Sequence, residues 1–121
     1  MTTKEIVQNF YEGLAQKSDQ WQQNLSEEIV FSDASKKLHA EGRDAFIQSF
    51  TSFLRAVERV QLKQLIVEGQ NAAAVVSYDY VSPKGNRLHQ DDAEVWKVVD
   101  GKITALTIYF DITEFRNFMG S

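Results

Sequence analysis

Cysteine is absent from the 121 residues of the chain. This absence excludes disulfide bonds, thiolate nucleophiles and thiolate-bound metals. Long apolar runs are absent too, since no stretch approaches the roughly 20 apolar residues that span a bilayer. The first residues, MTTKEIVQNFY, lack a cationic segment followed by an apolar one. We therefore expect a cytoplasmic protein that does not contact a membrane.

Basic residues are in the minority. The 13 Lys and Arg are scattered and outnumbered by 17 Asp and Glu, which gives a formal charge of −4. Binding to a phosphate backbone needs a concentrated basic surface, so nucleic acid is not an expected partner. Gly-rich phosphate loops, Gly-x-Ser-x-Gly elbows and His-Glu-x-x-His sites are also missing. Any chemistry is therefore expected to need no cofactor and no metal.

The residues that are present indicate one globular unit. The length suits a single domain over residues 1–121, and 43% hydrophobic with 25% charged residues is a common globular balance. Aromatic residues make up 12%, including eight Phe. Such side chains build either a dense core or the walls of a cavity.

The first half of the chain shows helical periodicity. Thr2-Thr3-Lys4-Glu5 has the spacing of a capping box and predicts a first helix that runs to about Lys17. Ser18 or Asp19 can cap a short second helix that carries Trp21 and Leu25. A third helix is predicted from about Asp44, with an apolar stripe formed by Phe46, Phe50, Phe53, Leu54 and Val57.

Strand patterns dominate the rest of the chain. Residues 28–33 alternate between apolar and polar side chains and predict a strand, and residues 34–41 are expected to form a polar loop. Four more strands are predicted at residues 59–68, 72–81, 87–99 and 102–113, because these segments are rich in Val, Ile, Tyr and Thr. Asp100-Gly101 suits a two-residue type I′ turn between the last two strands. Helices followed by an antiparallel meander predict an α+β fold, with one curved sheet and helices on one face.

Four segments carry a resemblance to a known superfamily. They are the first helix "IVQNFYEGL", the helix start "EGRDAF", the strand "VSYDY" and the hairpin "EVWKVVDGKI" followed by "YFD". Their order resembles the SnoaL-like polyketide cyclases, nuclear transport factor 2 and ketosteroid isomerase. The resemblance implies a cystatin-like antiparallel sheet wrapped around a long helix, which forms a cone with an internal pocket. It also implies a homodimer that associates through the outer face of the sheet.

The resemblance to ketosteroid isomerase suggests roles for particular residues. Asp33 matches the proton-shuttling acid and Glu94 the second carboxyl, whereas Phe10 stands where those enzymes have a phenol. Phe10 cannot donate a hydrogen bond, which disfavours steroid isomerisation. In the cyclases of this superfamily an acid and a histidine move protons, and Asp33, Glu94 and His89 are available here. The side chains expected to line the pocket are Phe10, Phe31, Phe50, Leu54, Val76, Trp96, Leu106, Ile108 and Phe110.

Strand alternation suggests how these groups could act. Asp33 follows Ile29 and Phe31 onto an apolar face, where lost hydration raises the pKa of a carboxyl towards neutrality. The competing interpretation is that Asp33 caps a turn with neighbouring serines. Tyr78 is expected to face inward, either as an ordinary core residue or as a hydroxyl donor near a cavity carboxyl.

Other polar groups have simpler interpretations. His89 could carry protons or bind a metal with Asp91, but His89, Asp91 and Asp92 fit a solvated strand start better.

Two classes of function therefore remain. The first is an isomerase or cyclase that acts on a small apolar or carbonyl-bearing molecule with Asp33, Glu94 and Tyr78. The second is a module that binds a ligand without catalysis or associates as a dimer, for which Val75, Val95 and Tyr109 on the outer face would matter more.

Overall fold

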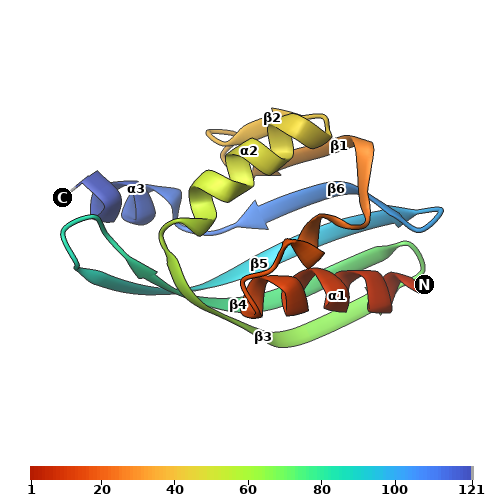
Figure 1. Cartoon of the computed structure of the whole chain (residues 1–121), viewed down its shortest axis with the longest axis horizontal. Coiled ribbons are helices and arrows are strands. Elements are labelled where there is room, and N and C mark those ends of the chain that lie inside the picture. The colour runs from red at the N-terminus through yellow and green to blue at the C-terminus, as the bar shows by residue number, and fades with distance from the viewer. Residues whose placement is uncertain (121) are drawn as a thin grey trace.

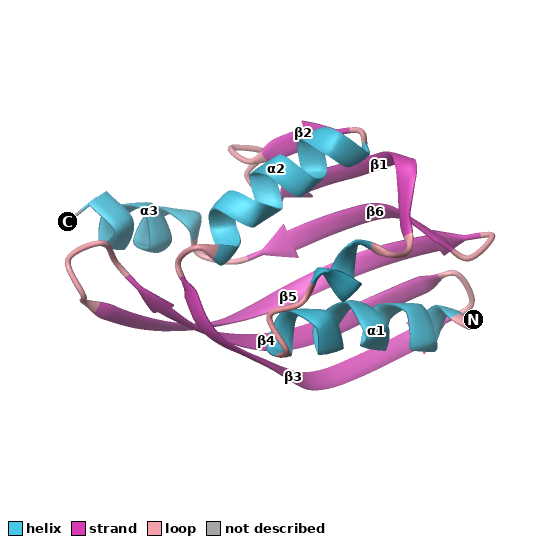
Figure 2. Cartoon of the chain, in the orientation of Figure 1, coloured by secondary structure: helices cyan, strands magenta, loops and turns pink. Residues whose placement is uncertain are grey.

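The computed structural model describes residues 1–120 (Figures 1 and 2). Three α-helices and one 3₁₀ helix combine with a single six-stranded sheet. The elements in chain order are α1 (Thr3–Ala15), η1 (Asp19–Gln22), β1 (Leu25–Asp33), β2 (His39–Glu41), α2 (Arg43–Leu54), β3 (Val57–Glu68), β4 (Asn71–Val81), β5 (Arg87–Val99), β6 (Lys102–Tyr109) and α3 (Ile112–Gly120).

The sheet has the strand order β2-β1-β6-β5-β4-β3. All neighbours pair antiparallel except β1 and β6, which run parallel, so the sheet is mixed where an antiparallel one was expected. Figure 1 shows α1 crossing the β3–β5 half of the sheet and α2 crossing the β1–β2 half. The predicted α+β cone is confirmed, with α3 at the end of the molecule opposite the N-terminus.

Helix α1 begins where the sequence predicts. The Thr2 side chain accepts a hydrogen bond from the Glu5 amide at 3.1 Å, and the Glu5 carboxylate accepts one from the Thr2 amide at 2.9 Å. This reciprocal capping box satisfies two backbone donors that a helix start otherwise leaves unpaired. At the other end, a Cβ on Gly13 would lie 2.5 Å from the Trp21 backbone nitrogen. The close packing of η1 on α1 therefore requires glycine at this position.

The hairpin between β5 and β6 is confirmed. Asp100 and Gly101 have φ values of 50° and 76°, as both central residues of a type I′ turn require. The two strands pair from Ala93↔Tyr109 to Val99↔Lys102. This register fixes which β5 side chains face the interior.

Several boundaries differ from the sequence prediction. The first helix ends at Ala15, Leu25 belongs to β1 and not to the second helix, and Val57 begins β3 and is not part of the third predicted helix, which ends at Leu54. Within the expected loop 34–41, His39–Glu41 forms β2 by pairing with β1. The last strand stops at Tyr109 because the Asp111 carboxylate caps α3, accepting a hydrogen bond from the Glu114 amide at 2.9 Å.

An aromatic core lies between the helices and the sheet. Phe10 contacts the rings of Tyr11, Trp21, Phe50 and Trp96 at centroid distances of 4.6–5.9 Å. Three of these four pairs are edge-to-face, a geometry that adds to the stabilisation that burial provides. Within residues 1–120, no helix is both long enough and apolar enough to cross a membrane.

Candidate functional site

The inner face of β5 carries the polar groups of the candidate site. Gln90, Asp92, Glu94 and Trp96 alternate along this strand, and each is at most 7% exposed. On the neighbouring strand β4, the side chains of Tyr78 and Tyr80 are fully buried on the same face. The two carboxyl groups of Asp92 and Glu94 are therefore buried on the same face of the sheet as aromatic side chains. Glu94 points inward, as its match to the second carboxyl of ketosteroid isomerase implied.

Glu94 is held by two phenols from different elements. Tyr78 of β4 donates its hydroxyl to Glu94 Oε2 at 2.7 Å, and Tyr11 of α1 donates to Glu94 Oε1. The indole Nε1 of Trp96 donates to the Tyr11 hydroxyl oxygen at 3.0 Å. Both oxygens of the Glu94 carboxyl group thus accept hydrogen bonds. The hydrogen bond from Trp96 orients the Tyr11 hydroxyl, which is one of the two donors.

Burial sets the protonation behaviour of this network. Complete burial raises the pKa of Glu94 to about 7, although the hydrogen bonds from Tyr11 and Tyr78 act in the opposite direction because they favour the charged form. Burial and the nearby charge of Glu94 raise the pKa of both phenols well above their usual range. The phenols therefore remain donors while Glu94 can exchange a proton near neutral pH.

Asp92 is the second inward carboxyl of β5. It is 1% exposed, and neither of its oxygens has a hydrogen-bond partner among residues 1–120. Burial, then the charge of Glu94, raises the pKa of Asp92 to about 8. The sequence interpretation of Asp92 as a solvated residue is wrong, because strand alternation places it on the same face as Glu94.

Asp33 is buried as expected, but its carboxylate is already bound. It accepts hydrogen bonds from the Ser35 amide at 3.0 Å, the Ser35 hydroxyl and the Leu38 amide at 2.8 Å. Burial alone would raise the pKa of Asp33, yet these donors outweigh it and the pKa is lowered. The expectation of a raised pKa at Asp33 is wrong, and the competing interpretation of a turn cap describes the geometry.

The expected pocket residues separate into several environments. Phe10, Phe50, Val76, Trp96, Leu106 and Ile108 are buried in the core. Phe31 lies in the wall of an open groove of about 820 Å³, whereas Leu54 lines a different cavity of about 520 Å³ beside α1 and η1. Phe110 packs on Phe53 and Phe115 at the end of β6.

Helix α3 packs against the sheet at the end of the molecule opposite the N-terminus. Its Phe115 contacts Tyr80 at a centroid distance of 4.8 Å and Phe53 at 5.7 Å. Gln90 Nε2 ties the helix to β5 by donating to the Asp111 carbonyl at 3.1 Å and to Glu114 Oε1 at 2.9 Å.

The open groove of about 820 Å³ extends to helix α3. Both Phe53 and Phe115 line it, together with side chains of β1, β2 and α2. Phe53 also contacts the rings of Tyr78 and Tyr80, and Phe115 contacts that of Tyr80, on the strand next to the buried carboxyl groups of β5.

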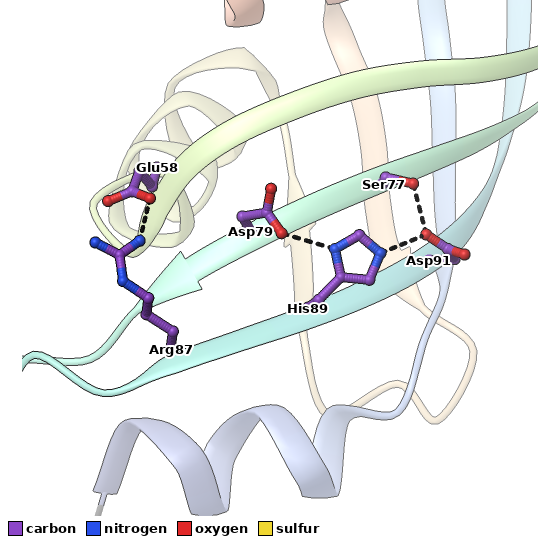
Figure 3. A network of polar contacts seen from close by, with 6 residues as sticks. All are labelled: Glu58, Ser77, Asp79, Arg87, His89 and Asp91. Carbon is purple, nitrogen blue, oxygen red and sulfur yellow. Dashed lines mark hydrogen bonds and ion pairs between the residues drawn. The ribbon is translucent and has the colours of Figure 1, made fainter.

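His89 lies outside this site. Figure 3 shows its ring between Asp79 and Asp91, with Nδ1 2.7 Å from Asp79 and Nε2 3.0 Å from Asp91. The hydrogen bond to Asp79 and, to a smaller extent, that to Asp91 raise the pKa of His89. Ser77 donates to the same Asp91 oxygen at 2.5 Å. His89 is on the outer face of the sheet, so it is not positioned to act with Glu94.

The part of the chain described here contains no cluster of three or more His, Cys, Asp or Glu side chains that could hold a metal.

The most informative residue missed in the sequence is Tyr11. The resemblance placed the helix phenol at Phe10, and a step of one residue turns a helix by about 100°. In the structure both side chains are buried, Phe10 at 1% and Tyr11 at 3% exposure, and Tyr11 reaches Glu94. Asp92 was also missed, although its spacing of two residues from both Gln90 and Glu94 could have placed its side chain on the same inward face.

The comparisons with known proteins agree with this architecture. A model of the SnoaL-like domain family matches residues 7–106. No curated protein sequence matches the chain significantly.

Solved structures match over almost the whole chain at low sequence identity, so they show the fold alone. TerC, co-crystallised with polyporic acid, has a TM-score of 0.83 at 16% identity and covers 98% of both chains. A protein of Jannaschia sp. CCS1, provisionally assigned as a SnoaL-like polyketide cyclase, has a TM-score of 0.84 at 15% identity over 98% of this chain and 92% of its own. A protein of Kribbella flavida DSM 17836, provisionally assigned as a ketosteroid isomerase, has a TM-score of 0.73 at 17% identity over 90% of this chain and 77% of its own.

Proposed function

This chain belongs to the SnoaL-like domain family, and from that premise we propose that it binds a small, largely apolar, carbonyl-bearing molecule and moves protons on it without a cofactor. Glu94 is the proton-transfer group, and Tyr11 and Tyr78 stabilise its charge. The reaction class is isomerisation or cyclisation through an enolate. Asp33, the other acid considered, has no such role because its oxygens are occupied by its own loop.

The observation that carries this proposal is the environment of Glu94. A carboxyl with no exposed surface accepts hydrogen bonds from two phenols on the inner face of the sheet. Structural carboxyl groups are seldom fully buried without a cationic partner. Buried acids with a pKa near neutrality are concentrated at sites of proton transfer.

The proton path is simple. Ionised Glu94 removes a proton from the carbon next to the ligand carbonyl, and the electron pair moves onto the carbonyl oxygen as an enolate. Protonated Glu94 then returns the proton to a different carbon, so atoms and charge balance without another reactant. Because the pKa of Glu94 is about 7, both of its forms are well populated at neutral pH.

Isotope exchange tests this role directly. The protein is mixed with a small cyclic enolisable ketone in deuterated water, and NMR follows the loss of the hydrogens next to the carbonyl. We expect Glu94→Gln to slow exchange by about 10²–10³-fold, as the loss of a positioned acid–base group does. The matched control Glu28→Gln changes an exposed strand residue and should exchange like the native protein. An unchanged rate in Glu94→Gln removes Glu94 from the role.

A non-catalytic binding module is the second candidate, and one observation favours it. The described cavities are lined by other residues, while Glu94 and Asp92 lie behind aromatic side chains. Such a module would bind an apolar ligand in the groove and give no exchange above the background rate in the native protein. The exchange assay therefore separates the two candidates.

The outer face of the sheet supports a further proposal, that two copies associate through it. Val75, Val95 and Tyr109 are 37%, 42% and 49% exposed, and the sheet register places them on neighbouring strands. Exposed apolar side chains gathered on one face are typical of association surfaces. Light scattering of the native protein should give twice the mass of one chain, and Val95→Glu should give the mass of one. A native protein that scatters as one chain at every concentration contradicts the proposal.

A further inference from the structure

A second cavity lies where the C-terminal ends of α1 and α2 meet η1 and the start of β3 (Figure 1). We call this space of about 520 Å³ the helix-end cavity, and its size is in the range of small-molecule sites. Among the described residues, its lining shares none with the groove beside α3 and includes none of Tyr11, Tyr78 and Glu94. The helix-end cavity is therefore separate from the proposed proton-transfer site.

Part of the lining of the helix-end cavity is apolar. Leu14 and Trp21 belong to this part, and each is 5% exposed. Leu54 of α2 and two residues of β3, Val57 and Val60, also line the cavity and are half-buried. A ligand that covers the remaining exposed surface of these side chains gains free energy, because apolar surface is removed from water. This part of the lining suits the apolar part of a ligand.

The rest of the lining carries charge. Four exposed side chains contribute it: Lys17, Asp19, Glu58 and Arg59. Glu58 forms an ion pair with Arg87, which balances its charge. Within residues 1–120, Lys17, Asp19 and Arg59 form no ion pair. Two unpaired cationic groups thus face one unpaired carboxylate, in a chain whose formal charge is −4. This local excess of positive charge favours an anionic group.

Lys17 has a backbone conformation that glycine adopts more easily. Its φ of 55° lies in the left-handed region, and it follows the last turn of α1 where glycine most often ends a helix. The Lys17 amide donates to the Leu14 carbonyl at 3.1 Å. The Ser18 amide donates to the Gly13 carbonyl at 3.0 Å, so the backbone alone caps the helix. The side chain of Lys17 is not needed for this cap, and a strained residue beside a cavity points to a role in binding.

We propose that the helix-end cavity binds a carboxylate with an apolar body, such as a medium-chain fatty acid. The apolar body contacts Leu14, Trp21 and Leu54, and the carboxylate pairs with Lys17 and Arg59. A guanidinium group suits a carboxylate because its planar fork can donate to both oxygens. The cavity binds this ligand without any part of the Glu94 network, so the inference goes beyond the proposed function and does not depend on it.

Three ligands separate the contribution of the charge from that of the apolar chain. Octanoate is the probe, octanol has the same chain without the charge, and butanoate has the same head group on a shorter chain. Their affinities are measured at neutral pH by NMR titration of the backbone amides. We expect octanoate to bind about tenfold more tightly than octanol, the combined effect of two partly exposed ion pairs. Butanoate should bind at least about tenfold more weakly than octanoate, because it removes less apolar surface from water.

The two tryptophans of the chain report where octanoate binds. Trp21 lines the helix-end cavity, whereas Trp96 is buried in the core and donates its indole N–H to Tyr11. Octanoate should shift the indole signal of Trp21 and leave that of Trp96 in place, and Trp21→Phe assigns the two signals. The proposal is overturned if octanoate does not bind, if octanoate and octanol bind equally, or if only the Trp96 signal shifts.

The variant Lys17→Gly tests the charge at the cavity. Glycine suits a φ of 55°, so the fold should be retained, as a urea unfolding curve checks. Octanoate should bind about threefold more weakly than to the native protein, and octanol equally well.

Lys36→Gly is the matched control. It also removes a lysine with a positive φ, 62°, and changes the net charge equally, but Lys36 does not line the helix-end cavity. This variant should bind octanoate like the native protein. An unchanged octanoate affinity in Lys17→Gly, or the same loss in Lys36→Gly, would overturn the proposal.

Discussion

Replacement of Asp92 by asparagine should make the protein more stable in alkaline solution. The native carboxyl is buried without a hydrogen-bond partner among residues 1–120, and its pKa is raised from 3.8 to about 8. A group whose folded pKa is raised binds its proton more tightly in the folded state. Stability is therefore lost as the pH rises from the unfolded pKa through the folded one.

The magnitude follows from these two pKa values. A tenfold difference in proton affinity between the folded and unfolded states corresponds to about 1.4 kcal/mol, so ionisation of Asp92 should remove about 4 kcal/mol of folding free energy between about pH 5 and about pH 9. For Glu94, with a pKa of about 7 against 4.5, the same relation gives about 2–3 kcal/mol. The native protein should show the sum of both effects, and Asp92→Asn only the part due to Glu94.

Urea unfolding at a series of pH values provides the assay. The free energy of unfolding of Asp92→Asn should fall much less steeply with pH than that of the native protein. The matched control is Asp91→Asn, the next residue, which lies on the outer face of the sheet. The Ser77 hydrogen bond lowers the pKa of Asp91, so this variant should gain nothing at alkaline pH. If the curves of Asp92→Asn and the native protein are parallel from about pH 5 to about pH 9, the buried ionisation inferred for Asp92 is refuted.

Three further substitutions test other parts of the structure. Tyr11→Phe removes one donor to Glu94, and should cost about 1–3 kcal/mol of unfolding free energy in urea and raise the pKa of Glu94 further in an NMR titration. Gly13→Ala, normally favourable in a helix by about 1 kcal/mol, should instead lower the melting temperature because its Cβ would lie 2.5 Å from the Trp21 backbone nitrogen. Asp33→Ala should cost about 1–3 kcal/mol at neutral pH and leave isotope exchange intact; a large loss of exchange in a folded variant would contradict its assignment as a turn cap.

Local patterns were sufficient to predict most of the fold. The capping box at Thr2, the apolar stripe of the helix carrying Phe46 and Phe50, and the turn at Asp100-Gly101 are each fixed by neighbouring residues, and each is observed. The superfamily resemblance supplied the arrangement of these elements. Helix α3 was missed because Ile112 and Phe115 fit a continued strand as well as a helix, and the cap at Asp111 was not recognised.

The candidate site could be predicted only in part. The inward direction of Tyr78 follows from strand alternation, whereas alternation alone did not decide that of Glu94 and Trp96, which the superfamily resemblance supplied; all three side chains are buried. Which hydroxyl reaches Glu94 depends on how α1 is rotated against the sheet, and this tertiary detail placed Tyr11 there.

The wrong expectation for the pKa of Asp33 had a different cause. Alternation gave its burial correctly, but its hydrogen bonds come from the loop that follows, whose shape depends on the pairing of β2 with β1. The sequence offered both interpretations of Asp33 and no means of choosing between them.

The most direct test of the proposed proton-transfer site is an NMR titration of the side-chain carboxyl carbons. Assignment uses Glu94→Gln and Asp92→Asn, each of which removes one signal. We predict that the Glu94 carboxyl titrates with a pKa of about 7 and the Asp92 carboxyl with a pKa of about 8, far above the usual carboxyl range. Ordinary midpoints near about 4 for both groups in the folded protein would contradict this prediction.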